Sequence, residues 1–78
     1  MITVYLATTR ADPPVVAGLS RSLDSLPSTW QTVDLYAVRL SDEALREAQD
    51  LLALPHTAHK ALPYLRRVAH SFTWIGNS

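Results

Sequence analysis

Two helix patterns that meet at a proline, in the part of the chain from Leu40 to Ser78, constrain the fold more than any other feature of the sequence. The first opens at Ser41-Asp42-Glu43, where the hydroxyl can accept a free backbone amide and both carboxylates lie at the positive end of the helix dipole. Pro55 ends this helix, because proline lacks the amide hydrogen that a continuing helix needs. The residues expected on its buried face recur at helical spacing: Leu45, Ala48, Leu51 and Leu52.

The second pattern runs from His56 to Ile75 and predicts a long terminal helix. Pro63 lies within it, so we expect the regular helix to start near that residue, and Gly76-Asn77 is typical of a helix end. We expect the apolar stripe of this helix to be the main packing face of the protein. The stripe contains Ala58, Ala61, Leu62, Leu65, Val68, Ala69, Phe72 and Ile75.

The first part of the chain predicts two strands separated by a helix. Residues 2–9 are rich in β-branched and aromatic side chains, with Ile2, Val4 and Leu6 on one face. Asp12-Pro13-Pro14 is typical of a helix start, and the apolar spacing from Val15 to Leu26 predicts the helix itself. A second strand follows over residues 33–40. In it, Val33, Leu35 and Ala37 lie on one face and Tyr36, Val38 and Leu40 on the other.

The order strand, helix, strand, helix, helix predicts an α/β fold: a small two-layer βαβαα domain that spans residues 1–78. A helical crossover between the two strands would make them parallel neighbours in a two-stranded sheet. A chain of 78 residues buries only about 60% of the surface that its unfolded form exposes, and two strands leave both sheet edges open. We therefore expect the protein to form a homo-oligomer or to bind a partner protein.

Charge and hydropathy exclude several other partners. Seven basic residues balance seven acidic ones, so no net positive field favours nucleic acid. No apolar run reaches the ~18 residues of a membrane span, and the N-terminus lacks the basic segment of a signal peptide. We expect a cytoplasmic protein that binds neither membrane nor nucleic acid.

No complete set of catalytic residues can be assembled. His56 and His59 would lie one helical turn apart, but His70 is distant in sequence and no carboxylate accompanies them, which favours polar surface positions over a metal site. The tripeptide Asp24-Ser25-Leu26 is the one that carries the modified serine in acyl carrier proteins, but the proline that follows argues against that context. Serine hydroxyls are present without an identifiable base. We expect a protein that is not an enzyme and has no cofactor.

Four side chains in the terminal pattern are candidates for partner binding: Tyr64, Arg66, Arg67 and Trp74. The arginines, with Lys60 and Arg39, concentrate positive charge that could meet a phosphate or an acidic partner, although a solvated helix face has the same composition. The aromatic residues are large and amphipathic, so they can serve either the core or an interface. Our first hypothesis is a small protein-binding domain that uses an apolar helix face or a strand edge.

A second hypothesis comes from a family resemblance over residues 33–77. The segments that carry it are Leu40-Ser41-Asp42-Glu43, Leu51 to Pro55, Lys60, Tyr64, Arg66-Arg67 and Phe72 to Asn77. Together they resemble the N-terminal lobe of surfactin-type 4'-phosphopantetheinyl transferases, with Asn77 in place of an acid. The resemblance implies that Lys60 contacts a phosphate of coenzyme A. The magnesium-binding acidic pair and the catalytic lysine motif of the family are absent, so such a lobe would need a second one for catalysis.

Overall fold

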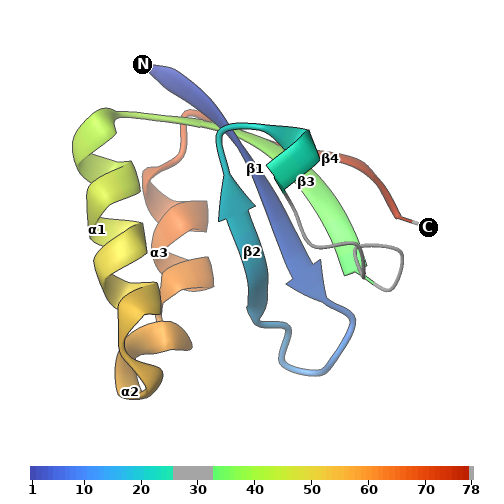
Figure 1. The fold of residues 1–78 in the computed structure, drawn as a ribbon, viewed down its shortest axis with the longest axis vertical. Coiled ribbons are helices and arrows are strands. Elements are labelled where there is room, and N and C mark those ends of the chain that lie inside the picture. Colours follow the sequence, from blue (N-terminus) through green and yellow to red (C-terminus); the bar gives the residue numbers. More distant parts are fainter. Residues whose placement is uncertain (26–32, 78) are drawn as a thin grey trace.

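Four antiparallel strands form one sheet in the computed structural model, which describes residues 1–25 and 33–77. Their order across the sheet is β2-β1-β3-β4, so that β2 and β4 are the edge strands (Figure 1). The strand bounds are β1 (Ile2–Thr9), β2 (Val16–Ser20), β3 (Val33–Leu40) and β4 (Ser71–Asn77).

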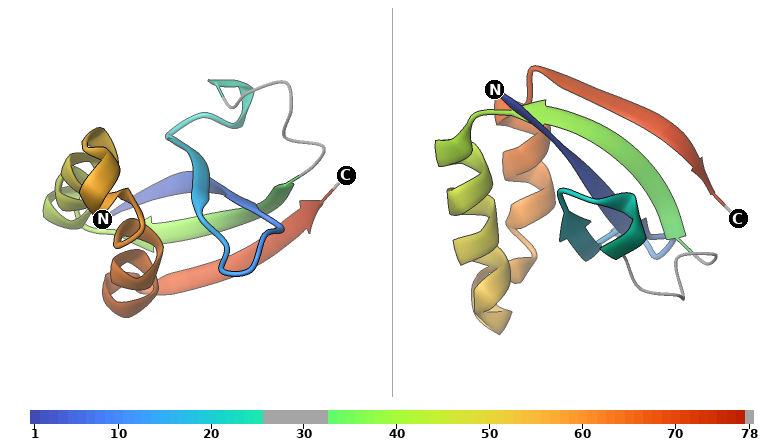
Figure 2. Two further views of the ribbon diagram at one scale, coloured as in Figure 1. Left: turned by 90° about the horizontal axis from the view of Figure 1, so that it is seen from below. Right: turned by 45° about the horizontal axis from the view of Figure 1, so that its top comes forward.

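The α-helices lie between β3 and β4 in the sequence and gather on one face of the sheet (Figure 2). They are α1 (Asp42–Ala53), α2 (Pro55–Ala58) and α3 (Ala61–Val68), and a short 3-10 helix, η1 (Leu23–Ser25), follows β2. None of the helices in the described parts of the chain is long and apolar enough to cross a membrane.

The predicted two-stranded parallel sheet and its βαβαα order are wrong, because the segment predicted as the first helix contains β2. Thr9 donates its backbone amide to the Val15 carbonyl at 2.9 Å, and the Val15 amide donates to the Thr9 hydroxyl at 3.1 Å. These bonds close a hairpin in which β2 runs antiparallel to β1. The predicted parallel crossover is therefore replaced by a hairpin, and β1 and β3 pair antiparallel over their whole length.

A β-bulge explains why β2 has the apolar spacing of a helix. Leu6 pairs with Leu19, and Thr8, two residues further along β1, pairs with Val16, three residues back along β2. The unmatched residue is Ala17, so Val16 and Leu19 both pack against the core on the helix side of the sheet. A three-residue spacing in a bulged strand therefore imitates one turn of a helix.

The terminal helix predicted through Ile75 is also wrong, because α3 ends at Val68 and the chain continues as β4. Val68 and Phe72 pack against the same core although one is helical and the other is in a strand, which explains the continuous apolar spacing. β4 is rich in β-branched and aromatic residues and satisfies the outer edge of β3, which a longer helix would leave open. Pro63 is the third residue of α3, where the missing amide hydrogen breaks no helical bond.

The main core lies between the helices and the sheet. Ala44 and Ala48 bring α1 close to the strands, while Leu62 and Leu65 contribute from α3. The two faces predicted for β3 are confirmed, because Val33 and Leu35 form a second cluster with Ala7 on the side opposite the main core. The buried core residues on the helix side are Val4, Leu6, Val38, Leu40, Ala44, Leu45, Ala48, Leu62 and Leu65.

The predicted start of α1 is confirmed in atomic detail. Ser41 is the N-cap, and its hydroxyl accepts the Ala44 amide at 3.1 Å while its carbonyl accepts the Leu45 amide. At the other end the Thr57 hydroxyl donates to the Leu51 carbonyl at 2.7 Å, which satisfies one of the last helical acceptors. Hydrogen bonds thus hold both ends of α1 in place.

Candidate functional site

The edge strand β4 presents the most distinctive surface of the described structure. It pairs with β3 on one side, and no described strand pairs with its other side. Trp74 is 56% exposed and Ile75 is 45% exposed, although both are large apolar side chains. No residue from Ser71 to Asn77 carries a charge. The strand therefore combines open backbone hydrogen-bonding groups with exposed apolar area.

Interactions at the start of β4 hold this strand in place. The His70 amide donates to the Arg39 carbonyl at 2.8 Å and begins the pairing with β3. The Phe72 ring lies 4.8 Å from the Tyr36 ring, centroid to centroid, and the Arg66 guanidinium lies 5.3 Å from the Phe72 centroid. These contacts occupy Phe72, whereas Trp74 and Ile75 further along remain exposed. The exposed residues Trp74 and Ile75 thus follow a segment of β4 that is held against β3 and the core.

A second bulge changes the pairing at the exposed end of β4. Leu35 pairs with Gly76 and Tyr36 pairs with Trp74, so Ile75 is the unmatched residue. Gly76 has φ of 149°, a backbone conformation that residues with a Cβ rarely adopt. The glycine accommodates the bulge that leaves Ile75 exposed.

The opposite edge, β2, is a weaker binding edge than β4. It has five residues, and the bulge at Ala17 interrupts its pairing. None of its larger side chains is exposed, since Val16 and Leu19 are half-buried against the core. Arg21, directly after the strand, forms a salt bridge of 3.5 Å with Asp42. Short edge strands are one means by which proteins protect sheet edges, and β2 is shorter than β4 and, unlike β4, exposes no large apolar side chain.

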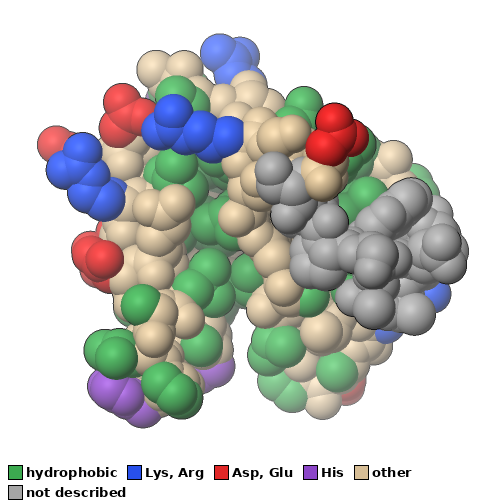
Figure 3. Space-filling model, in the orientation of Figure 1, with side chains coloured by type: hydrophobic (Ala, Val, Ile, Leu, Met, Phe, Trp, Pro, Cys, Tyr) green, Lys and Arg blue, Asp and Glu red, His purple; other side chains and the backbone are tan. Residues whose placement is uncertain are grey.

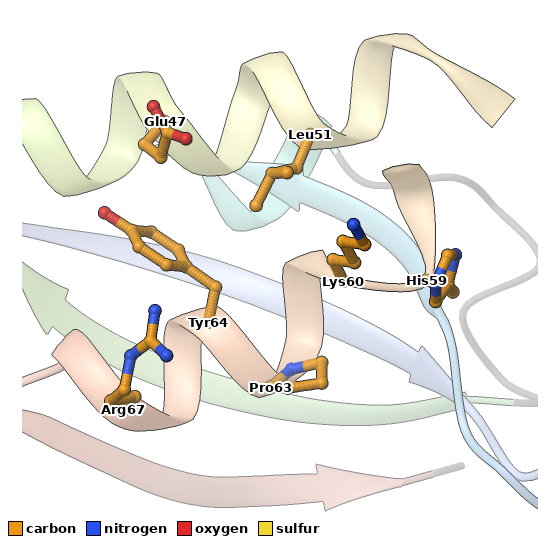
Figure 4. Close-up of a pocket in the computed structure, with 7 residues that line it drawn as sticks. All are labelled: Glu47, Leu51, His59, Lys60, Pro63, Tyr64 and Arg67. Atoms are coloured by element: carbon orange, nitrogen blue, oxygen red, sulfur yellow. The ribbon is translucent and has the colours of Figure 1, made fainter. Parts of the chain in front are cut away.

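A separate hollow of about 420 Å³ lies between α1 and α3. Glu47 and Leu51 line it from α1, and the other side chains come from α3 and the turn before it (Figure 4). The Arg67 guanidinium lies 5.6 Å from the centroid of the Tyr64 ring. The full lining is Glu47, Leu51, His59, Lys60, Pro63, Tyr64 and Arg67.

An apolar cleft of about 340 Å³ lies on the side of α3 that faces the β1–β2 turn. Pro13, Pro14 and Val15 line it from the turn, and Leu62 and Arg66 are among the side chains that line it from α3. Figure 3 shows the cleft opening at the lower end of the molecule, between the helices and the turn.

The structure divides the predicted site residues among three places. Lys60, Tyr64 and Arg67 line the hollow between α1 and α3, Arg66 borders the apolar cleft and stacks on Phe72, and Trp74 lies on β4. They do not form one surface.

The other sequence candidates do not converge on a site. His56, His59 and His70 are exposed, and the described residues contain no group of three or more side chains that could hold a metal ion. Ser25 is the last residue of η1. Leu26 of the carrier-like tripeptide lies outside the described residues, as do one further serine hydroxyl, Ser28, and the second tryptophan of the sequence, Trp30.

Comparison with known proteins identifies no relative. No family model, curated protein or solved structure matches the chain. The transferase resemblance therefore stays a prediction, and function must be inferred from the surfaces themselves.

Sequence reasoning missed Ile75 and the contribution of α1 to the hollow. Ile75 was assigned to a buried helical stripe, although the uncharged run from Ser71 to Asn77, rich in β-branched and aromatic residues, is typical of a strand. Glu47 and Leu51 carry no sequence signal that relates them to Lys60, because that relation depends on how α1 packs beside α3.

Proposed function

We propose that this protein is a non-enzymatic protein-binding domain that acts through the free edge of β4 by pairing with an extended strand of a partner. The observation that carries the proposal is the uncharged edge of β4 with Trp74 and Ile75 exposed. An open strand edge presents a row of amide donors and carbonyl acceptors, and a strand added there satisfies both.

The exposed side chains give such pairing a source of affinity. Tryptophan is enriched among the residues that dominate binding energy at interfaces. Covering the exposed 56% of Trp74 would remove about 130 Å² from water, which corresponds to about 3 kcal/mol at the usual coefficient for apolar area. Ile75 would add a smaller amount. Backbone hydrogen bonds would then set the register of the partner strand.

A second copy of the chain is the simplest partner of this kind. Two β4 strands can pair antiparallel around a twofold axis without bringing like charges together, because Ser71 to Asn77 contains none. The four-stranded sheets of two protomers would then join edge to edge. A strand from another protein could use the same edge.

The test places a lysine on the edge and compares it with a lysine placed elsewhere. Ile75→Lys introduces the charge that natural proteins use to protect edge strands. Leu54→Lys is the matched control, because Leu54 is 50% exposed but lies between α1 and α2, away from β4. Both variants change the net charge equally and replace an exposed aliphatic side chain.

Sedimentation velocity from micromolar to millimolar concentration should show reversible dimers of the wild type and of Leu54→Lys, and monomers of Ile75→Lys. If all three proteins are monomeric, they should be used as baits in parallel pull-downs. A partner protein recovered by the wild type and Leu54→Lys but lost with Ile75→Lys supports strand addition by another protein. The proposal is wrong if the three baits behave alike.

A further inference from the structure

The hollow between α1 and α3 contains cationic side chains without anionic partners. Lys60 and Arg67 are both exposed, and within the described residues neither forms a salt bridge with a carboxylate. Arg67 instead stacks on Tyr64 at 5.6 Å, which holds its guanidinium at the wall of the hollow. Positive charge is therefore available to a bound molecule.

The charges are distributed unevenly along the hollow. Lys60 and Arg67 are seven residues apart, which corresponds to about 10 Å along a helix axis, with Tyr64 between them. Across the hollow, Glu47 lies toward the Arg67 end and Leu51 toward the Lys60 end (Figure 4). The negative charge of Glu47 partly neutralises the positive charge of Arg67. Lys60 instead faces the apolar side chain of Leu51, and His59 is its neighbour in sequence. The Lys60 end is the electropositive one.

The rest of the lining is apolar. Leu51 and Tyr64 are half-buried, so that each offers a firmly held surface, and Pro63 adds a rigid ring. The volume of about 420 Å³ falls within the range of small-molecule sites, in which apolar walls and a few polar groups fix the ligand. A molecule that uses both parts of the lining has an apolar body and one negative end.

We propose that this hollow binds a small organic anion: an aromatic or aliphatic body that lies on Leu51 and Tyr64, with a carboxylate or phosphate held by Lys60. The ammonium group of Lys60 donates charge-assisted hydrogen bonds to the oxyanion, and the apolar body displaces water from the half-buried side chains. This site is separate from the β4 edge, so it stands or falls independently of the proposed function.

Four probes separate the two parts of the ligand. 2-Naphthyl phosphate and 2-naphthoate carry the aromatic body with each kind of oxyanion, 2-naphthol carries the body without the charge, and inorganic phosphate carries the charge without the body. Each is titrated into the ¹⁵N-labelled full chain, and amide shifts are followed by NMR. One or both naphthyl anions should shift the amides around Leu51, Lys60 and Tyr64, with affinities about tenfold or more above those of 2-naphthol and inorganic phosphate.

Charge-removing variants test the assignment of Lys60. Lys60→Gln should weaken binding of the naphthyl anions about fivefold to tenfold, because one charge-assisted hydrogen bond is lost. Arg46→Gln is the matched control: it removes the same charge from an exposed residue of α1 that borders a different hollow, with Arg21 and Asp42. Binding by the control should be unchanged.

Several results would overturn the proposal. If neither naphthyl anion changed the amide chemical shifts, or if the changes were confined to β4, the hollow would not be a binding site. If 2-naphthol bound as tightly as the naphthyl anions, the negative charge would not contribute to binding. If inorganic phosphate bound as tightly, the apolar walls would not contribute. If Lys60→Gln and Arg46→Gln weakened binding of the naphthyl anions equally, the anions would be attracted by the overall charge of the protein and not by a specific site.

Discussion

Truncation of Leu65 on α3 should remove a large share of the stability of this protein. Leu65 is fully buried, and it belongs to the cluster that joins the helices to the sheet. Leu65→Ala deletes three carbon atoms worth about 0.8 kcal/mol each, or about 2.4 kcal/mol, and the cavity left behind raises the total to about 3–4 kcal/mol. A domain of 78 residues has a total stability of about 4–12 kcal/mol.

Urea and thermal unfolding followed by far-UV circular dichroism measure this loss. The melting temperature should fall by about 12 °C or more, since each kcal/mol shifts it by about 4–8 °C in a domain of this size. Because self-association would add stability, the comparison is made in the Ile75→Lys background. Leu54→Ala deletes the same atoms from a side chain that is 50% exposed, and it should cost less than about 1 kcal/mol. Equal losses in the two variants would refute the packing argument.

Two further substitutions test local features in the same assay. Ser41→Ala should cost about 1 kcal/mol, because the Ala44 amide loses its acceptor; an unchanged urea midpoint would disprove the cap. Gly76→Ala should cost about 1–2 kcal/mol through backbone strain, since φ is 149° and no described residue other than its two chain neighbours lies within 4 Å of the added methyl position. A stability equal to or above that of the wild type would contradict this conformation.

The elements that sequence predicts correctly are those decided by local interactions. In β1 and β3 every second residue lies on the same face, because the two strands pair regularly over eight positions, so the faces assigned from a period of two are correct. The start of α1 depends on Ser41 and the three residues after it. Neither case requires knowledge of distant parts of the chain.

The segment of β2 has helical spacing because of its bulge, and the segment of β4 has it because its apolar residues continue the spacing of α3. The bulge at Ala17 gives Val16 and Leu19 a spacing of three. Phe72 follows Val68, the last residue of α3, at a helical interval and packs on the same core. The composition of Ser71–Asn77 favours a strand, and pairing with the open edge of β3, more than thirty residues earlier in the sequence, outweighs the helical spacing.

The candidate sites likewise contain some residues that local sequence predicts and others that depend on tertiary packing. The spacing of Lys60, Tyr64 and Arg67 already places them on one stripe of a helix, and the structure brings them into one hollow. Arg66 points elsewhere, toward Phe72. The wall supplied by Leu51 depends on tertiary packing, and the exposure of Ile75 depends on the bulge in β4, so neither could be predicted from local sequence.

The bulges determine where this chain can change its length. Loss of Ala17 would leave Val16 and Leu19 two residues apart, so both would keep their place on the core side and β2 would become a regular strand. Loss of Ile75 would leave Trp74 and Gly76 adjacent, opposite Tyr36 and Leu35, and the pairing of β4 would become regular. A residue lost from within β1 or β3 would instead turn over every side chain beyond it. Deletion of the bulge residue is therefore expected to preserve the pairing of β2 and of β4, whereas a deletion within β1 or β3 is expected to disrupt the core.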